Sequence, residues 1–166
     1  MIHFVKKRFA LPAETVKTIE FPYVYLNHRL INEKGLTVEF VAKSLAHYLS
    51  RKHDVFRVLA LTELTQDHGW LENKVAKMAY MKRAGDLYIV PFSQQNIDEV
   101  EQHHVEHGTP WSYDSYVPLI FSQAQFKAQQ VVRPVSTTDI AATLAIILNI
   151  KQPSACTGKP LIEVIK

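Results

Sequence analysis

Two patterns of apolar and polar residues alternate along this chain, one typical of strands and the other typical of helices. Short runs rich in aromatic and β-branched residues favour strands. These runs cover residues 21–26, 55–61, 86–92 and 117–121. Apolar positions three and four residues apart favour helices. They cover residues 37–51, 71–83, 136–149 and 160–166. Strands that alternate with helices predict an α/β fold, with a mixed, mainly parallel sheet flanked by helices.

The clearest predicted helix covers residues 136–149 and begins with hydroxyl and carboxylate side chains. Ser136, Thr137 and Asp139 could act as a nucleophile and a base, but capping of an apolar helix explains their spacing. The apolar run at 140–150 is too short to span a bilayer. We therefore expect a buried helix in a globular protein, and no membrane partner.

Length and composition predict a single domain over residues 1–166. The chain is 47% hydrophobic and 21% charged, which is typical of a globular protein with its own core. Residues 1–20 are mixed and polar, and Pro12 breaks any long helix there. We interpret residues 1–20 as a lead-in segment, followed by the main region at 21–166.

Charge, cysteine content and the amino terminus exclude several classes of protein. The net charge is +3, and the basic residues are spread apart from the cluster at residues 6–8. A scattered charge of this size predicts no nucleic-acid partner. The single cysteine, Cys156, rules out an internal disulfide, and we interpret it as an inert loop residue. No apolar segment of signal-peptide length is present, and the compartment is left open.

The long polar connection at residues 93–116 is the strongest candidate for a functional site. It follows the predicted strand at 86–92, and sites in α/β sheets lie in loops after the carboxyl ends of strands. His107 stands in it on a loop containing glycine and proline. His103, His104 and His107 could also form a metal cluster of their own. Together with Asp67 they would make a complete small metallohydrolase, the third of three functions that we consider.

Several segments, in one order along the chain, resemble the alkaline phosphatase superfamily, in its phosphodiesterase and nucleotide pyrophosphatase branch. Residues 107–114, H-G-T-P-W-S-Y-D, resemble the family's H-G-S-P-Y-x-Y-D, and residues 83–86 resemble its R-S-G-D. Residues 135–144 resemble V-S-x-x-D-I-A-P-T-L, with Ala142 in place of a usual proline. Weaker matches lie at residues 24–27, 117–121 and 158–161. The resemblance implies a partial alkaline-phosphatase-like core.

Members of this family hydrolyse phosphate monoesters or diesters at two zinc ions. Two dications about 4 Å apart can stabilise both the attacking and the leaving oxygen. The resemblance makes His107 the last zinc ligand, and a neutral imidazole is a suitable donor for zinc. The family's nucleophile and other ligands lie upstream of the first matched segment, where residues 1–20 offer no match. The triplet at 67–69, Asp-His-Gly, occupies the wrong place in the family order, and we interpret it as turn chemistry.

The resemblance therefore implies the C-terminal segment of a zinc-dependent phosphoric-ester hydrolase, inactive alone, which supplies His107 to a site completed elsewhere. No catalytic residue is assigned within this chain. A phosphate ester is then its substrate only when the site is completed. The family is commonly periplasmic or secreted.

The second function that we consider is a non-catalytic binding or assembly protein that retains the fold. An apolar surface left uncovered would favour a homo-oligomer or an upstream partner chain. Two questions stay open around His107. Asp114 is either a general base or a residue that shapes the loop. Trp111 and Tyr113 either stack on a substrate or pack the loop.

Overall fold

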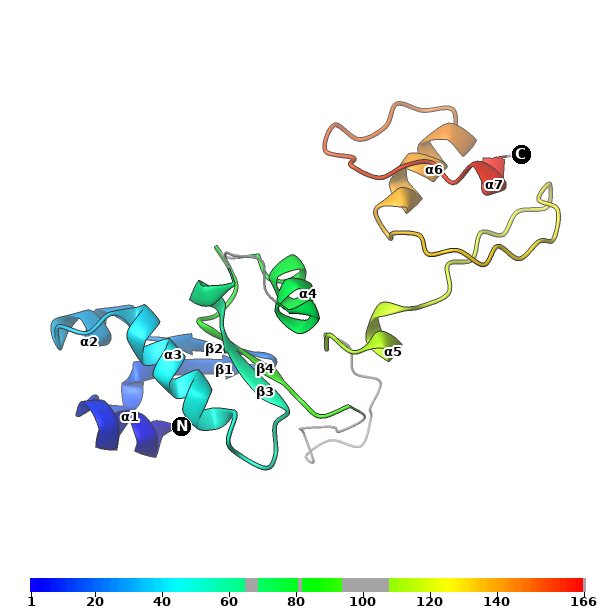
Figure 1. Ribbon diagram of the computed structural model, residues 1–166. Helices are drawn as coiled ribbons and strands as arrows, with labels where there is room; N and C mark the ends of the chain where they lie inside the picture. Colours follow the sequence, from blue (N-terminus) through cyan, green and yellow to red (C-terminus); the bar gives the residue numbers. More distant parts are fainter. Residues whose placement is uncertain (65–68, 81, 94–107, 166) are drawn as a thin grey trace. The chain divides into compact units, whose positions relative to one another are not determined.

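The computed structural model describes residues 1–64, 69–80, 82–93 and 108–165 (Figure 1). It divides into two compact units, Met1–Val117 and Pro118–Lys166, and each is described by itself. The prediction of one domain over 1–166 stays a prediction. The first unit contains α1 (Ile2–Phe9), η1 (Ala13–Thr15), β1 (Val16–Glu20), β2 (Tyr23–Leu26), α2 (His28–Glu33), α3 (Val38–Leu49), β3 (Arg57–Ala60), η2 (Leu61–Glu63), α4 (Trp70–Met78), β4 (Leu87–Val90) and α5 (Ser112–Ser115). The second unit contains α6 (Asp139–Ile147) and α7 (Ile162–Ile165).

The described residues form one sheet with the strand order β1-β2-β4-β3. Every pair of neighbouring strands in it is antiparallel. The predicted α/β class is confirmed, but the prediction of a mainly parallel sheet is wrong. Strands β2 and β3 run in the same direction, as the alternating pattern suggested. They do not pair, because β4 lies between them and runs opposite to both.

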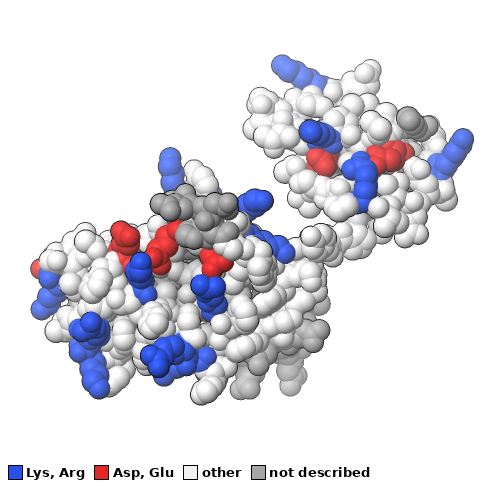
Figure 2. Space-filling model, viewed as in Figure 1, with Lys and Arg blue, Asp and Glu red and all other residues white. Residues whose placement is uncertain are grey.

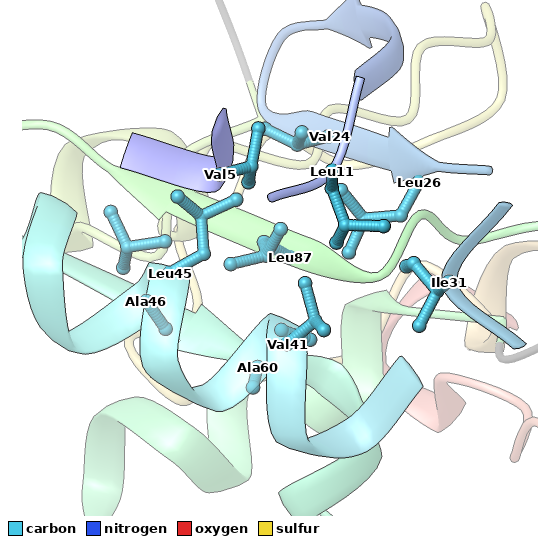
Figure 3. Close-up of a cluster of buried hydrophobic side chains, with 12 residues drawn as sticks. Val5, Leu11, Val24, Leu26, Ile31, Val41, Leu45, Ala46, Ala60 and Leu87 are labelled. Carbon is cyan, nitrogen blue, oxygen red and sulfur yellow. The ribbon is translucent and has the colours of Figure 1, made fainter. Parts of the chain in front are cut away.

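Helices cover both faces of this sheet, because side chains alternate between the two faces along each strand. On one face, Val24, Val58 and Leu87 pack against buried side chains of α1, α2 and α3 (Figure 3). On the other face, Leu59, Tyr88 and Val90 pack against Leu71 and Val75 of α4. Each fully buried leucine or valine stabilises the fold by about 1.5–3 kcal/mol. Because both of its faces are packed, the sheet is a firm support for the segments that join it.

Residues 1–20 are an integral part of this core, although the sequence suggested a lead-in. Val5 of α1 is fully buried, and Phe4 stacks on Tyr48 of α3 with ring centroids 4.2 Å apart. Pro12 does not break α1, because the helix has already ended at Ala10, whose φ of 52° is left-handed. Strand β1 then pairs with β2.

Most of the predicted elements are present, with shifted ends. Helix α3 confirms the prediction over 37–51, and the Thr37 hydroxyl accepts a hydrogen bond from the Phe40 amide at 3.2 Å. Helix α4 stops at Met78, earlier than predicted. The predicted strand at 117–121 is wrong, because the described residues provide no strand that pairs with it. Instead the segment has no regular secondary structure and is largely exposed, with Ile120 80% accessible.

The second unit is built on the predicted cap of α6. The Asp139 carboxylate accepts hydrogen bonds from the backbone amides of Ser136 at 3.0 Å and Lys159 at 2.8 Å. The buried Thr143 hydroxyl donates to the Asp139 carbonyl at 2.7 Å and accepts from the Leu161 amide at 2.9 Å. These bonds tie α6 to the segment that leads into α7, and they support capping as the role of residues 136–139. Within the described part of the chain, no helix has the length and apolar character to cross a bilayer.

Candidate functional site

The predicted metal donors fall in parts of the chain that the structure does not describe. His103, His104 and His107 lie outside the described residues, and so does Asp67. The described part of the candidate site starts at Gly108, immediately after His107. We call residues 108–116 the anchor loop, because three sets of contacts join it to the sheet or brace it internally.

The first contact ties the start of the anchor loop to the sheet. Gly108 has a φ of +103°, a conformation that favours glycine. Its carbonyl oxygen accepts a hydrogen bond from the hydroxyl of Tyr88, which is fully buried on β4. Burial, with a smaller effect of Tyr23 and Asp114, raises the pKa of Tyr88. The phenol therefore keeps its proton at neutral pH and remains a donor to Gly108.

The second contact closes the anchor loop on itself. One oxygen of the Asp114 carboxylate, in the first turn of α5, accepts from the Thr109 amide at 2.9 Å. The same oxygen accepts from the Thr109 hydroxyl at 2.5 Å. Ser115 donates to the Trp111 carbonyl at 2.9 Å. These contacts favour a loop-shaping role for Asp114 over the role of a general base.

The third contact is made by Trp111, whose ring nitrogen donates to the carbonyl of Pro91 just after β4, at 3.0 Å. The indole packs on Phe56 with centroids 5.1 Å apart and on Trp70 at 5.9 Å. Aromatic pairs of this kind contribute about 0.5–1.5 kcal/mol beyond the area that they bury. Packing of the loop thus accounts for Trp111, whereas Tyr113 is exposed.

The segment at 83–86 has a structural role. The Asp86 carboxylate accepts from the Leu26 amide at 2.7 Å and pairs with the His28 ring at 2.7 Å. A side chain on Gly85 would place its Cβ 2.5 Å from the Val24 carbonyl oxygen, so only glycine fits there. This segment holds the ends of β2 and β4 together. Sequence reasoning missed His28, the first residue of α2, because nothing nearby in sequence indicates its partner.

The donor set for a metal is incomplete in the described residues. No group of three or more His, Cys, Asp or Glu side chains gathers in the parts of the chain that the structure describes. Cys156 is partly buried and forms no disulfide. The described side chains alone therefore do not form a metal site.

No protein-family model matches this sequence. Curated relatives are nevertheless similar to it. Alkaline phosphatase PafA of Elizabethkingia meningoseptica is 28% identical over 144 residues, which is 86% of this chain and 26% of PafA. A calcium-transporting ATPase of Myroides odoratus is 26% identical over 156 residues, or 93% of this chain and 28% of the relative. Alkaline phosphatase PhoV of Synechococcus elongatus is 29% identical over 100 residues, 58% of this chain and 17% of PhoV.

Solved structures agree with the sequence relatives. The crystal structure of wild-type PafA matches all of this chain with a TM-score of 0.84 and 26% identity, over 32% of the PafA chain. A mutant of PafA matches 98% of this chain with a TM-score of 0.81 and 25% identity, over 31% of its length. The chain thus spans about a third of the PafA fold. These relatives do not single out the phosphodiesterase and nucleotide pyrophosphatase branch. By sequence and by fold, this chain is similar to alkaline phosphatases and carries part of their fold, which supports a place for it in the alkaline phosphatase superfamily.

Proposed function

We propose that this chain supplies the C-terminal part of a zinc-dependent phosphoric-ester hydrolase, a phosphomonoesterase or phosphodiesterase, and contributes His107 as one zinc ligand. The proposal rests on one observation above the others. The residues that directly follow His107 are fixed to the sheet of an alkaline-phosphatase-like fold by Tyr88 and by Trp111, and the Thr109–Asp114 contacts brace them internally.

Such anchoring is what a metal ligand on a loop requires. A ligand must be held close to its working geometry, and hydrogen bonds and packing beyond the ligand provide that support. The anchor loop offers three independent supports within a few residues. Two of them join backbone carbonyls to buried or packed rings, so they do not depend on exposed side chains that are free to move.

The described residues do not by themselves fit a zinc ion, because they gather no trio of donors. One histidine cannot replace the three or four protein ligands of a typical zinc site. The remaining ligands and the nucleophile would therefore come from other residues of the phosphatase fold. We expect the 166-residue chain to be inactive by itself.

Hydrolysis assays on the purified chain test this expectation. Wild type and His107→Ala would be incubated with a chromogenic phosphate monoester and a chromogenic diester, with and without added zinc. We expect no zinc-dependent turnover from either protein. Zinc-dependent turnover that disappears in His107→Ala would contradict the proposal, since a complete site would then exist within these residues.

A second candidate is a non-catalytic binding or assembly protein, favoured by the amount of exposed apolar surface after residue 117. This candidate differs from the hydrolase segment in how the assembled protein responds to a substitution of His107. An assembly protein would join its partner equally well with alanine at position 107, and hydrolysis by the assembled protein would not respond to that substitution.

A further inference from the structure

The second unit exposes large apolar side chains at about twice the frequency of the first. Eleven of its 48 described residues are exposed large hydrophobic residues, whereas the 98 described residues of the first unit also contain eleven. We call these side chains the apolar surface of the second unit: Leu119, Ile120, Val131, Val132, Val135, Leu144, Ile146, Leu148, Ile150, Ile162 and Ile165. Apolar exposure of this density marks a site of interaction.

The interior of the same unit is too small to stabilise it. Among its described residues, the buried hydrophobic side chains are Ala142, Ala145 and Leu161. Two of the three are alanines, which bury little area. A segment of about 40–50 residues needs an unusually dense core, a metal, disulfides or a partner to fold stably. The second unit therefore needs something to cover it.

Helix α6 shows which side lacks cover. Ala142 and Ala145 face inward, whereas Leu144 and Leu148, one turn apart, are exposed on the same side of the helix. Ile146 is exposed as well. A helix that is apolar all round is normally covered on all sides. Here the second unit itself provides only part of that cover.

The described segments of the unit outside its helices also lack strand partners. Val132 is 90% accessible and Ile120 is 80% accessible, and no strand includes either residue in the part of the chain described. Such segments bind best where another chain offers apolar pockets and backbone groups that pair with theirs. The sequence suggested a buried strand at 117–121, and a partner would restore that environment.

Charge adds a constraint on the partner. The described residues of the second unit include only six charged ones, and on the face seen in Figure 2 most of this unit is uncharged. Arg133 is paired with Glu163 at 2.5 Å, and Asp139 is held by backbone amides. The surface thus resembles the inside of a fold more than a transient, polar interface.

We propose that the apolar surface of the second unit is the docking site for the remaining part of an alkaline phosphatase fold. The solved PafA chain matches this chain over its full length but is only 32% covered by it. About two thirds of that fold is therefore available to cover the surface. This inference rests on the proposed function, because the same partner would carry the rest of the hydrolytic site.

Co-expression tests the docking. The full 166-residue chain would be produced together with the part of Elizabethkingia meningoseptica PafA that lies outside its matched region. The matched region of PafA itself, produced with the same piece, serves as the positive control. Sedimentation velocity of the purified proteins, without substrate, measures association. The variants are Val132→Lys and Ile120→Lys, and the matched control is Tyr80→Lys, which is 61% accessible in the first unit.

We expect a one-to-one complex, weakened at least about tenfold by each lysine in the second unit and unaffected by Tyr80→Lys. Two results would overturn the proposal. One is no complex with this chain when the PafA control associates. The other is self-association of the chain that the same two variants abolish, which would make a second copy the occupant. Hydrogen exchange of residues 1–64 in each variant checks that the first unit stays folded.

Association and hydrolysis are measured separately, so the two proposals can fail separately. A complex that Val132→Lys weakens but that hydrolyses nothing would sink the proposed function and leave the docking site intact. A complex that hydrolyses phosphate esters and is unaffected by both lysine variants would sink the docking site and leave the proposed function intact.

Discussion

Replacing Tyr88 by Phe removes one hydroxyl from the buried face of β4 and leaves the ring in place. The ring still packs edge-on against Tyr23, with centroids 5.3 Å apart. What is lost is the hydrogen bond to the carbonyl of Gly108, the first residue after His107. The substitution therefore tests whether the sheet holds the anchor loop, with little disturbance to packing.

The expected magnitude follows from where the two partners lie. A hydrogen bond contributes about 0.5–1.5 kcal/mol net, and a buried acceptor left without a donor costs about 1–3 kcal/mol. Gly108 is only partly buried, so water can replace the phenol in part. We expect the loop to be weakened by about 1 kcal/mol, which corresponds to about fivefold more frequent opening.

Hydrogen exchange followed by mass spectrometry measures that opening directly. Peptides covering residues 108–116 should exchange about fivefold faster in Tyr88→Phe than in wild type. Tyr25→Phe is the matched control, because its exposed hydroxyl donates to the Arg83 carbonyl, away from the loop. The reasoning would be refuted if residues 108–116 exchanged at the wild-type rate, or if Tyr25→Phe had the same effect on them.

Three further predictions concern stability. Gly85→Ala should destabilise the first unit by about 1–3 kcal/mol in urea unfolding, since the new Cβ meets the Val24 carbonyl; an unchanged midpoint would contradict this. Because burial raises the pKa of Tyr88, the protonated phenol is favoured in the folded state, and stability should fall as the pH rises above 10. Tyr88→Phe should fall less steeply in the same titration. Backbone amides of Lys159 and Ser136 lower the pKa of Asp139. The contribution of this carboxylate to stability is therefore present above about pH 4 and lost below it. The protection of residues 158–165 against exchange, relative to the intrinsic rate at each pH, should fall on acidification in wild type and be low at every pH in Asp139→Ala.

Elements were predictable from local patterns, but their arrangement was not. The pattern of apolar residues located α3 because it buries one regular face, and it located β3 and β4 because they are short apolar runs buried on both faces of the sheet. Pairing direction has no such local signal. The insertion of β4 between β2 and β3 depends on contacts between segments far apart in sequence. The interpretation of residues 1–20 as a lead-in missed contacts of the same kind, since Phe4 stacks on Tyr48 of α3 and β1 pairs with β2.

In the candidate site, too, the local segment was predictable from sequence and its long-range contacts were not. The loop after His107 could be located from its glycine, its proline and its resemblance to a family segment. Its supports could not be foreseen. The hydroxyl that holds Gly108 comes from Tyr88, 20 residues earlier, and the His28–Asp86 pair spans 58 residues. Only the fold brings such residues together.

The central claim is that His107 of this chain completes a zinc-dependent hydrolytic site. The most direct test is hydrolysis of a chromogenic phosphate monoester, in the presence of zinc, by the chain co-expressed with the part of PafA that lies outside the matched region. Loss of a supporting residue at a metal site costs up to about a hundredfold, and loss of a ligand should cost at least that much. We predict zinc-dependent turnover with wild-type chain that falls at least about a hundredfold with His107→Ala, while the complex still forms. Equal turnover from both complexes would contradict the claim.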